Sequence, residues 1–405
     1  MNLKFFSMFS GIGAPEKALE NLGIDYELVG YSEIDKYASK SYSAIHGVPE
    51  SKNLGDITKV NEKELPKDID LCVYGFPCQD ISNAGKMKGL FNEDGTQTRS
   101  GLFFEALRII EETQPKIAIA ENVKNLTCKR FEKQFKIVLD SLEEAGYHNY
   151  WKVLNAKDFG IPQNRERVFI VSIRKDIDTG FQFPEGFPLE KRLKDILEDE
   201  VDEKYYLSEK QVNFITHPKR LNKYTNVDPD YAMCNTTRYP DAWNGTYVSE
   251  PVVKQIGNCC PTKTRDNPNQ GRVYDTDGLS PSLNCMGGGN RQPFVMVKEA
   301  TKKGYAEATE GDSVNLEQPN SKTRRGRVGK GVAQTLTTSC NQAVVDEDVR
   351  LRKLTPKECF RLMGFDDESF HRAEAVNSNS QLYKQAGNSI VVNVLEYIFK
   401  ALYEI

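Results

Sequence analysis

The sequence lacks two features that would place a chain across a membrane or outside the cell. None of its apolar runs approaches the roughly 20 residues that a transmembrane helix needs. The N-terminal stretch MNLKFFSMFSG is too short, and too close to the first predicted strand, to be a secretory signal peptide. We therefore expect a cytoplasmic protein with no membrane partner.

The cysteine content argues against two further classes. Nine cysteines in 405 residues are sparse for a disulfide framework, and their odd number fits one poorly. Their spacing does not resemble a structural zinc site, because Cys259 and Cys260 are adjacent, Cys285 is distant and no histidine pair lies nearby. We expect no bound metal, and we expect most of the cysteines to be small buried hydrophobic residues.

Net positive charge is also absent, since the formal net charge is -4 at pH 7. This value does not exclude nucleic acid as a partner, because binding requires a basic face and not a basic whole. Positions 320–330 carry basic side chains and no acidic one: Lys322, Arg324, Arg325, Arg327 and Lys330. This run predicts either a nucleic-acid contact or a solvated loop, and taken alone it does not favour either.

The N-terminal part has the pattern of an α/β fold. Short apolar runs alternate with amphipathic stretches over the first 175 residues, as in βαβ units. We predict strands at 3–9, 26–31, 71–74, 116–120 and 167–173, and helices at 15–22, 35–45, 102–112 and 131–145. This alternation indicates a doubly wound, mostly parallel sheet.

The composition changes after residue 180. Asn, Gly, Pro, Thr and Ser dominate between 213 and 341, and the helical periodicity disappears. Helical signals return at Thr355-Pro356-Lys357-Glu358, a capping box with proline at the first helical position, and again at 389–402. A chain of 405 residues exceeds the usual size of one core. We therefore predict a domain formed by 1–180 and 346–405, interrupted by a smaller strand- and loop-rich domain at 181–345.

A glycine turn follows the first predicted strand. The segment FSGIGA, residues 9–14, would let the backbone approach a nucleotide at the carboxyl end of that strand. Glu33 lies 20 residues beyond Gly13, where an acid can bind a ribose diol. Asp56 has a similar position after a strand and could bind an adenine amino group. Taken alone, each of these acids is more often a helix cap.

The segment GFPCQDIS, residues 75–82, carries the strongest chemical signal. The preceding strand brings Cys78 to the edge of the sheet, where a thiolate can act as a nucleophile. A lone cysteine is more often structural, but Glu121 ends the next strand, and Arg165 and Arg167 stand two residues apart beside a further strand. A nucleophile, an acid and two cations at neighbouring strand ends are difficult to attribute to packing.

In combination, these segments resemble the DNA cytosine-C5 methyltransferase family of prokaryotic and phage modification enzymes. The matching segments follow the family's order: FSGIG, Glu33 with Asp35, Gly55-Asp56-Ile57, GFPCQDIS, RSGLFFEALRII, ENV, QNRERVF, RKLTPKECFRLMGF and QAGNSIVVNVL. They cover residues 1–175 and 350–405 and imply a Rossmann-like fold that binds S-adenosylmethionine. One departure is Gly13-Ala14, where the family often has Gly-Gly.

The resemblance implies a covalent mechanism. Cys78 would attack C6 of a cytosine, Glu121 would bind N3, and Arg165 would hold O2. Arg167 would orient Glu121 or simply pair with a carboxylate. The base must flip out of the duplex, because its reacting atoms are inaccessible in a stacked helix. The methyl group would come from S-adenosylmethionine, with S-adenosylhomocysteine as the product.

The resemblance also assigns binding residues. The cofactor pocket would comprise Phe9, Gly11, Ile12, Gly13, Glu33, Ile34, Asp56, Ile57, Pro77, Leu102, Asn388 and Ser389. The loop after Cys78 would close over the flipped base, and 181–345 would be the target-recognition domain. The predicted contacts to double-stranded DNA are Gln79, Ser82, Lys86, Arg291, Arg324, Arg325 and Arg327. We expect a monomer, with a restriction endonuclease of the same specificity as a possible partner that does not bind stably.

Three alternatives are weaker. A tRNA cytosine-C5 methyltransferase would use the same Cys78 and Glu121, but the large middle insert favours duplex DNA as the substrate. A nicotinamide dehydrogenase would explain the glycine turn and Glu33, but not GFPCQ, ENV and QNRER together. A non-catalytic relative would be expected to have lost Cys78, Glu121 or Arg165, and all three are present.

Overall fold

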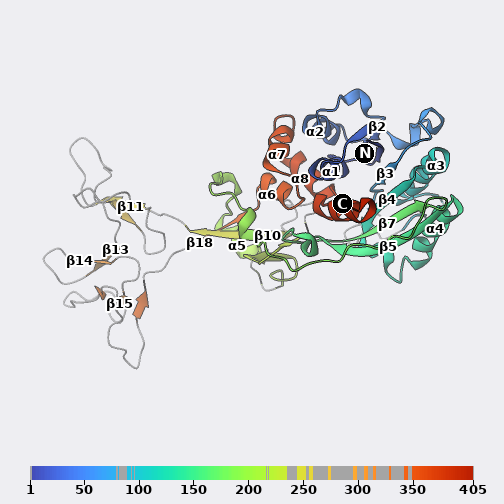
Figure 1. Ribbon diagram of the computed structural model, residues 1–405. Coiled ribbons are helices and arrows are strands. Elements are labelled where there is room, and N and C mark those ends of the chain that lie inside the picture. The colour runs from blue at the N-terminus through green and yellow to red at the C-terminus, as the bar shows by residue number, and fades with distance from the viewer. Residues whose placement is uncertain are drawn as a thin grey trace. The chain divides into compact units, whose positions relative to one another are not determined.

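Figure 1 shows a computed structural model of the chain. It describes residues 2–78, 81, 89–92, 94, 96–215, 217, 219–234, 244–251 and 349–404, together with the strand segments 255–258, 272–274, 295–298, 305–308, 313–315, 328–329 and 342–344. The chain forms two compact units. One comprises Met1–Tyr205, Asn213–Tyr247 and Lys353–Ile405, and the other Tyr206–Val212 and Val248–Arg352.

A six-stranded sheet forms the centre of the first unit, with the order β2-β1-β3-β4-β7-β5. Its strands are β1 (Leu3–Met8), β2 (Tyr26–Ser32), β3 (Leu71–Tyr74), β4 (Ile117–Val123), β5 (Tyr147–Asn155) and β7 (Glu166–Arg174). The pairs β1–β2, β1–β3 and β3–β4 are parallel, whereas β7 runs antiparallel to both β4 and β5. This arrangement confirms the predicted α/β fold with a mostly parallel sheet.

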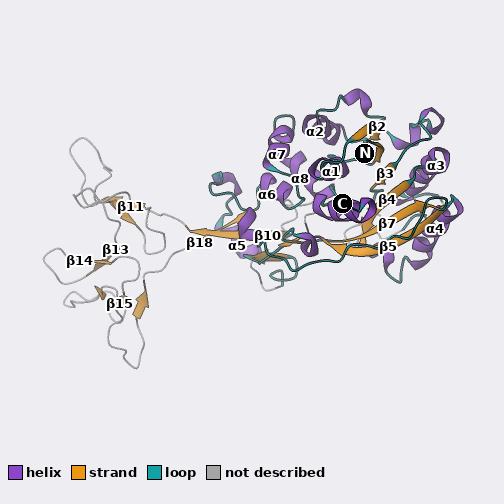
Figure 2. Ribbon diagram, viewed as in Figure 1, coloured by secondary structure: helices purple, strands orange, loops and turns teal. Residues whose placement is uncertain are grey.

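Alternate strand residues point to opposite faces of the sheet, and helices cover the apolar side chains on these faces. One face carries Phe6, Met8, Cys72, Tyr74 and Ala118, which belong to one buried cluster with apolar residues of α3 (Phe103–Thr113) and α4 (Glu132–Glu144). Figure 2 shows both helices beside the strands. Within the described residues, no helix is both long enough and apolar enough to cross a membrane.

The two ends of the chain pack together in the first unit. The N-terminal helices are α1 (Ala14–Asn21) and α2 (Lys36–His46), and the C-terminal ones are α6 (Pro356–Arg361), α7 (Asp367–Glu374), α8 (Asn379–Asn388) and α9 (Val392–Tyr403). Helix α9 contacts α1 and α7 contacts α2, as their positions in Figure 1 show. The predicted capping box is confirmed, since Thr355 Oγ1 accepts from the Glu358 amide and the Glu358 carboxylate accepts from the Thr355 amide.

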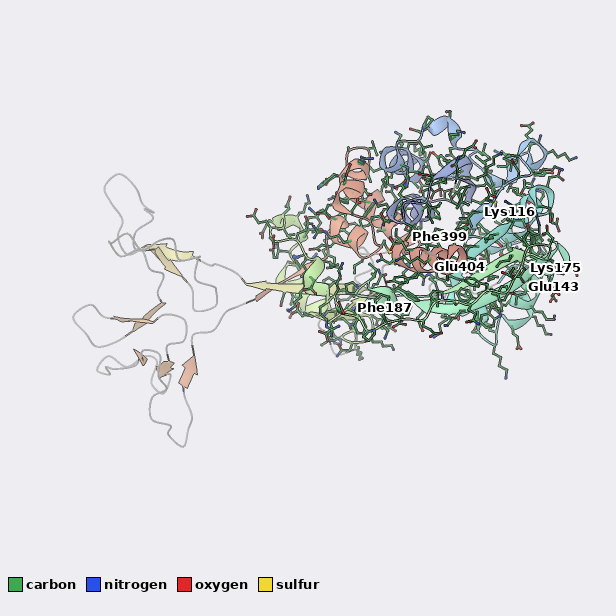
Figure 3. All side chains as sticks on the ribbon, in the orientation of Figure 1. Lys116, Glu143, Lys175, Phe187, Phe399 and Glu404 are labelled. Carbon is green, nitrogen blue, oxygen red and sulfur yellow. The ribbon has the colours of Figure 1, made fainter. Side chains whose placement is uncertain are left out.

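Part of the region beyond residue 180 packs with the first unit. The Phe187 ring, labelled in Figure 3, lies 5.3 Å from that of Tyr397 in α9 (centroid to centroid). The other elements before residue 251 are β6 (Gln163–Asn164), α5 (Glu209–Ile215), β8 (Thr225–Val227), β9 (Ala232–Met233) and β10 (Gly245–Pro251). Asn213–Tyr247 belongs to the first unit, although the amino-acid composition already changes after residue 180.

The described residues between 255 and 353 form strands. These are β11 (Gln255–Asn258), β12 (Arg272–Tyr274), β13 (Val295–Lys298), β14 (Tyr305–Ala308), β15 (Ser313–Asn315), β16 (Val328–Gly329), β17 (Gln342–Val344) and β18 (Val349–Lys353). β11 pairs with β12, β13 with β14, and β15 with both β16 and β17, all antiparallel. The assignment of 181–345 to target recognition remains a prediction.

Candidate functional site

The carboxyl ends of β1, β3 and β4 meet at one edge of the sheet. The chain changes direction across the sheet there, because β2 pairs with one side of β1 and β3 with the other. Open α/β sheets bind their ligands in the crevice at such a switch point. The loops that follow β1 and β3 carry the predicted glycine turn and Cys78, and Glu121 lies near the carboxyl end of β4.

The glycine turn (residues 9–13) leaves β1 in a backbone conformation that most residues avoid. Phe9, Gly11 and Gly13 have φ angles of 53°, 58° and 82°, which lie in the left-handed region that favours glycine. A Cβ atom on Gly13 would lie 2.2 Å from His46 Nε2, whereas one on Gly11 would meet nothing within 4 Å. His46 Nε2 lies 3.0 Å from the Ile12 carbonyl oxygen. The turn is therefore supported by His46 and open at Gly11.

Glu33 lies against this turn, and Ile34 follows it in the chain. The Glu33 carboxylate accepts hydrogen bonds from the amides of Gly11 (2.9 Å) and Asp35 (2.7 Å). Burial raises the pKa of Glu33 above its ordinary value, although both amide contacts oppose the shift. The Ile34 side chain is 74% exposed. An acid and an open apolar side chain are therefore adjacent, as binding of a ribose with its attached base would require.

The remaining predicted cofactor residues differ in exposure. The side chains of Ile12 and Ile57 are buried, so only their backbone groups could contact a ligand. Asp56 Oδ1 accepts from Thr58 N (3.1 Å) and Thr58 Oγ1 (2.9 Å), which lowers the pKa of Asp56. Asp56 thus has the capping role that the sequence left open as an alternative. Pro77 and Leu102 are half-buried, Asn388 is exposed and Ser389 is buried.

Cys78 lies just beyond the end of β3. The Asn122 side chain donates to the Phe76 carbonyl (3.0 Å), which ties this loop to β4. The thiol is half-buried. Burial and the charge of Glu121 raise the pKa of Cys78, whereas Arg167 and Arg165 act in the opposite direction.

Glu121 forms an ion pair with Arg167 (Oε1 to Nε, 3.0 Å). The antiparallel register pairs Val123 of β4 with Arg167 of β7, so β7 begins where β4 ends. Only 13% of the Glu121 side chain and 18% of the Arg167 side chain are exposed. Burial raises the pKa of Glu121, although Arg167 and Arg165 counteract this effect.

Arg165 joins the two ends of the chain at this edge. Its side chain is almost completely buried, and Nη2 donates to the carbonyl oxygens of Ser389 (2.7 Å) and Gly387 (3.2 Å). The segment between α8 and α9 is therefore held beside β7. Burial lowers the pKa of Arg165, and the nearby charge of Arg167 adds to this effect.

Cys234 is a member of this group that the sequence did not indicate. Its sulfur accepts from Arg165 Nη1 (3.4 Å) and Arg167 Nη2 (3.7 Å). Burial opposes its ionisation, but the two guanidiniums outweigh burial and lower the pKa of Cys234. We refer to Cys78, Glu121, Arg165, Arg167 and Cys234 as the Cys78 cluster. No local pattern marks Cys234, which lies in the polar middle of the chain, 69 residues from Arg165.

The structure thus brings Cys78, Glu121, Arg165 and Arg167 into one group of interacting charges, beside a turn that Glu33 supports. The predicted DNA contacts lie outside the described residues: Gln79, Ser82, Lys86, Arg291, Arg324, Arg325 and Arg327.

Comparison with known proteins supports the family resemblance that the sequence motifs indicate. Residues 3–404 match the family described as C-5 cytosine-specific DNA methylase. The chain is 37% identical to the orphan methyltransferase M.SPRI of Bacillus phage SPR, over 99% of this chain and 97% of that protein. It is 33% identical to the type II methyltransferase M.HhaI of Haemophilus parahaemolyticus, over 98% and 93% of the two chains.

Solved structures share the fold at lower sequence identity. The Entamoeba histolytica methyltransferase EhMeth superposes with a TM-score of 0.59 at 15% identity, covering 100% of this chain and 98% of that one. The Schizosaccharomyces pombe Dnmt2 methyltransferase gives a TM-score of 0.57 at 18% identity, covering 99% and 98%. Because the family match spans nearly the whole chain, this protein belongs to the C-5 cytosine-specific DNA methylase family.

Proposed function

We propose that the protein methylates C5 of a flipped-out cytosine in a specific duplex DNA sequence through a covalent bond between Cys78 and C6. The observation that supports this most directly is the grouping of a half-buried thiol, Cys78, with a buried acid, Glu121, and two guanidiniums at one strand edge. Each of these groups has a separate task in activating a pyrimidine ring.

Cys78 supplies the nucleophile. C5 of cytosine is unreactive in the aromatic ring, and attack by the Cys78 thiolate on C6 converts the ring into an enamine with a nucleophilic C5. In the free protein the raised pKa of Cys78 favours the protonated thiol. The thiolate therefore forms under the influence of Arg165 and Arg167, which stabilise negative charge on the sulfur.

Glu121 and the arginines stabilise the ring as it is attacked. Glu121 pairs with Arg167 as a carboxylate in the free protein, and its raised pKa favours the uptake of a proton that it can donate to N3 as negative charge develops there. Arg167 contacts Oε1 of Glu121 and so orients the carboxyl group. Arg165 would hold the O2 atom of the base. After methylation, loss of the C5 proton and cleavage of the C6–sulfur bond release 5-methylcytosine and regenerate Cys78.

The residues around the glycine turn suit S-adenosylmethionine. Gly11 leaves open space at the turn, Glu33 offers a carboxylate for the ribose hydroxyls, and Ile34 offers an exposed apolar surface for the adenine. Asp56 and the other predicted pocket residues would complete the contacts. When bound, S-adenosylmethionine supplies the electrophilic methyl group. The proposed chemistry requires no metal.

Double-stranded DNA is the proposed macromolecular partner of a monomeric enzyme. A base inside a duplex must be unstacked at a cost of a few kcal/mol before Cys78 can reach it. The relatives named above include both a type II and an orphan methyltransferase. A restriction endonuclease acting on the same sites is therefore a partner to test and not one that the chain requires.

The test uses a duplex library in which cytosine is replaced by 5-fluorocytosine. Elimination of Cys78 requires loss of a proton from C5, and fluorine at that position cannot leave as a cation. After methyl transfer the protein should therefore remain covalently attached to DNA through Cys78, as mass spectrometry of the digested adduct would show. Cys78→Ser should form no adduct and transfer no labelled methyl group, while still binding S-adenosylmethionine. Cys128→Ala, a change at another half-buried cysteine, is the control. An adduct at another residue, turnover by Cys78→Ser, or a preference for tRNA would refute the proposal.

A further inference from the structure

Cys234 reaches the Cys78 cluster through a short parallel ladder. β6 pairs with β9 in the register Gln163 to Ala232 and Asn164 to Met233. Arg165 directly follows Asn164 and Cys234 directly follows Met233, so both residues stand at the end of this ladder. The backbone before the thiol is fixed further, because the amide of Ala232 donates to the Pro162 carbonyl at 2.6 Å. Strand pairing therefore holds the backbone of Cys234 next to that of Arg165.

The sulfur of Cys234 contacts each guanidinium at a nitrogen different from the one that bonds Ser389 or Glu121. Arg165 uses Nη2 for the carbonyl of Ser389 and Nη1 for the sulfur. Arg167 uses Nε for Glu121 and Nη2 for the sulfur. Cys234 thus bridges one guanidinium that is anchored to the backbone and one that is paired with the acid.

The bridge reduces the electrostatic repulsion between the two guanidiniums. Arg165 and Arg167 carry the same charge in one buried group, and the charge of Arg167 contributes to the lowered pKa of Arg165. An electron-rich sulfur between the guanidiniums offsets their repulsion, and hydrogen bonds to an ionised acceptor are the stronger ones. The two thiols of the cluster also differ, since the arginines prevail over burial at Cys234 and not at Cys78.

We propose that Cys234 is a positioning residue for methyl transfer, whose sulfur holds Arg165 and Arg167 at the spacing in which Arg167 faces Glu121. This inference rests on the proposed function, because that function gives Glu121 and the arginines their tasks. If the cysteine only filled space, its loss would lower stability without changing how the cluster titrates.

The experiment compares Cys234→Ala, Cys234→Ser and Cys128→Ala in steady-state methylation of duplex DNA. Cys234→Ala should lower kcat by roughly 10-fold or more, because small misplacements of catalytic groups have large effects on rate. Its KM for S-adenosylmethionine should not change. Cys234→Ser should retain most of the activity, since a hydroxyl oxygen also accepts hydrogen bonds. Cys128→Ala should behave as wild type.

A second measurement detects the charge of Cys234. Both Cys234 variants remove a thiol whose pKa the arginines lower, and with it the negative charge that its ionised form places beside Arg165 and Arg167, the cations that face Cys78 together with Glu121. The pH profile of Cys78 alkylation by iodoacetamide should therefore move to lower pH in both variants. This readout holds even if Cys234→Ala does not fold, because Cys234→Ser is a smaller change.

Three results would overturn the inference: wild-type kcat in Cys234→Ala, an unshifted Cys78 profile in Cys234→Ser, or an equal loss of activity in Cys128→Ala. Adduct formation with 5-fluorocytosine DNA separates this failure from that of the proposed function. If the wild type forms no adduct at Cys78, the proposed function is wrong. If the wild type and Cys234→Ala form the adduct at equal rates, only the role of Cys234 is wrong.

Discussion

The glycine turn and the Cys78 cluster lie at the same edge of one sheet, but different interactions hold them. Backbone hydrogen bonds dominate in the turn, where the Ser10 amide donates to the Ser32 carbonyl (3.1 Å) and the Gly13 amide donates to the Ser10 carbonyl (3.0 Å). Side-chain charges dominate in the Cys78 cluster, where Arg167 pairs with Glu121 and shares a sulfur with Arg165.

This difference has consequences for mutation. Backbone hydrogen bonds persist when a neighbouring side chain is changed, so the turn depends mainly on backbone conformation and on space. A buried group of charges is more sensitive, because removal of one charged side chain leaves an opposite charge buried without a partner. We therefore expect substitutions in the Cys78 cluster to reduce kcat, and substitutions at the turn to weaken cofactor binding.

The largest expected effect is that of Glu121→Gln. The amide cannot protonate N3, so kcat should fall by about 10²- to 10⁴-fold, the usual contribution of a general acid. Cofactor affinity should remain near wild type, as isothermal titration calorimetry would show. Glu112→Gln removes a partly exposed acid on α3 and provides the control. A loss of cofactor affinity equal to the loss of kcat would show that the two regions do not act separately.

The second largest expected effect is the pH dependence of alkylation at Cys78 and Cys234. Because the pKa of Cys78 is raised by burial and by Glu121, its thiolate is the minor form at neutral pH. Alkylation of Cys78 by iodoacetamide should speed up by about 10-fold per pH unit until the pH reaches that pKa. Cys234, with a lowered pKa, should level off at lower pH. Peptide mass spectrometry distinguishes the two residues, and parallel profiles would contradict the assignment.

Glu121→Gln sharpens this measurement. Removing the negative charge that raises the pKa of Cys78 should shift its alkylation profile to lower pH. A profile that stays in place would mean that Glu121 does not contribute to the raised pKa of Cys78.

The smallest expected effect is that of Gly13→Ala in the turn. Its Cβ atom would lie 2.2 Å from His46 Nε2, and the φ of 82° is unfavourable for alanine. The affinity for S-adenosylmethionine should fall by roughly 10-fold, if displacing the turn costs the 1–2 kcal/mol typical of a left-handed residue with a side chain. Gly23→Ala, with a φ of 65° and open space around it, has the same strain without the contact. Equal cofactor affinity in both variants would show that the His46 contact has no role.

The sequence predicted most of the framework from local patterns. The alternation of apolar runs and amphipathic stretches located β1, β2, β3, β4 and β7 to within a few residues of their observed bounds. The capping box at Thr355 predicted the start of α6, because the hydrogen bonds of a cap join residues only three positions apart. Strand β5 and helices α7 and α8 were not predicted. The buried and exposed residues of β5 follow no regular alternation.

The direction of β7 was decided by the tertiary structure alone. Residues that precede a parallel strand lie at the opposite edge from those that follow its neighbours, so Arg165 and Arg167 would have been far from Cys78 in a fully parallel sheet. The antiparallel pairing of β7 with β4 brings them to the same edge. Strand order and direction depend on contacts between distant segments, which a local pattern does not encode.

By itself, the sequence determined the fold class, the glycine turn and the identity of Cys78, Glu121, Arg165 and Arg167 as candidates, because each rests on residues close together in the chain. Only the tertiary structure added Cys234 to them. Its pairing with the arginines depends on a two-residue ladder between β6 and β9, segments that are 69 residues apart in sequence. So short a ladder leaves no periodic signal, and its effect on the Cys78 cluster arises only where the folded chain brings charges into contact.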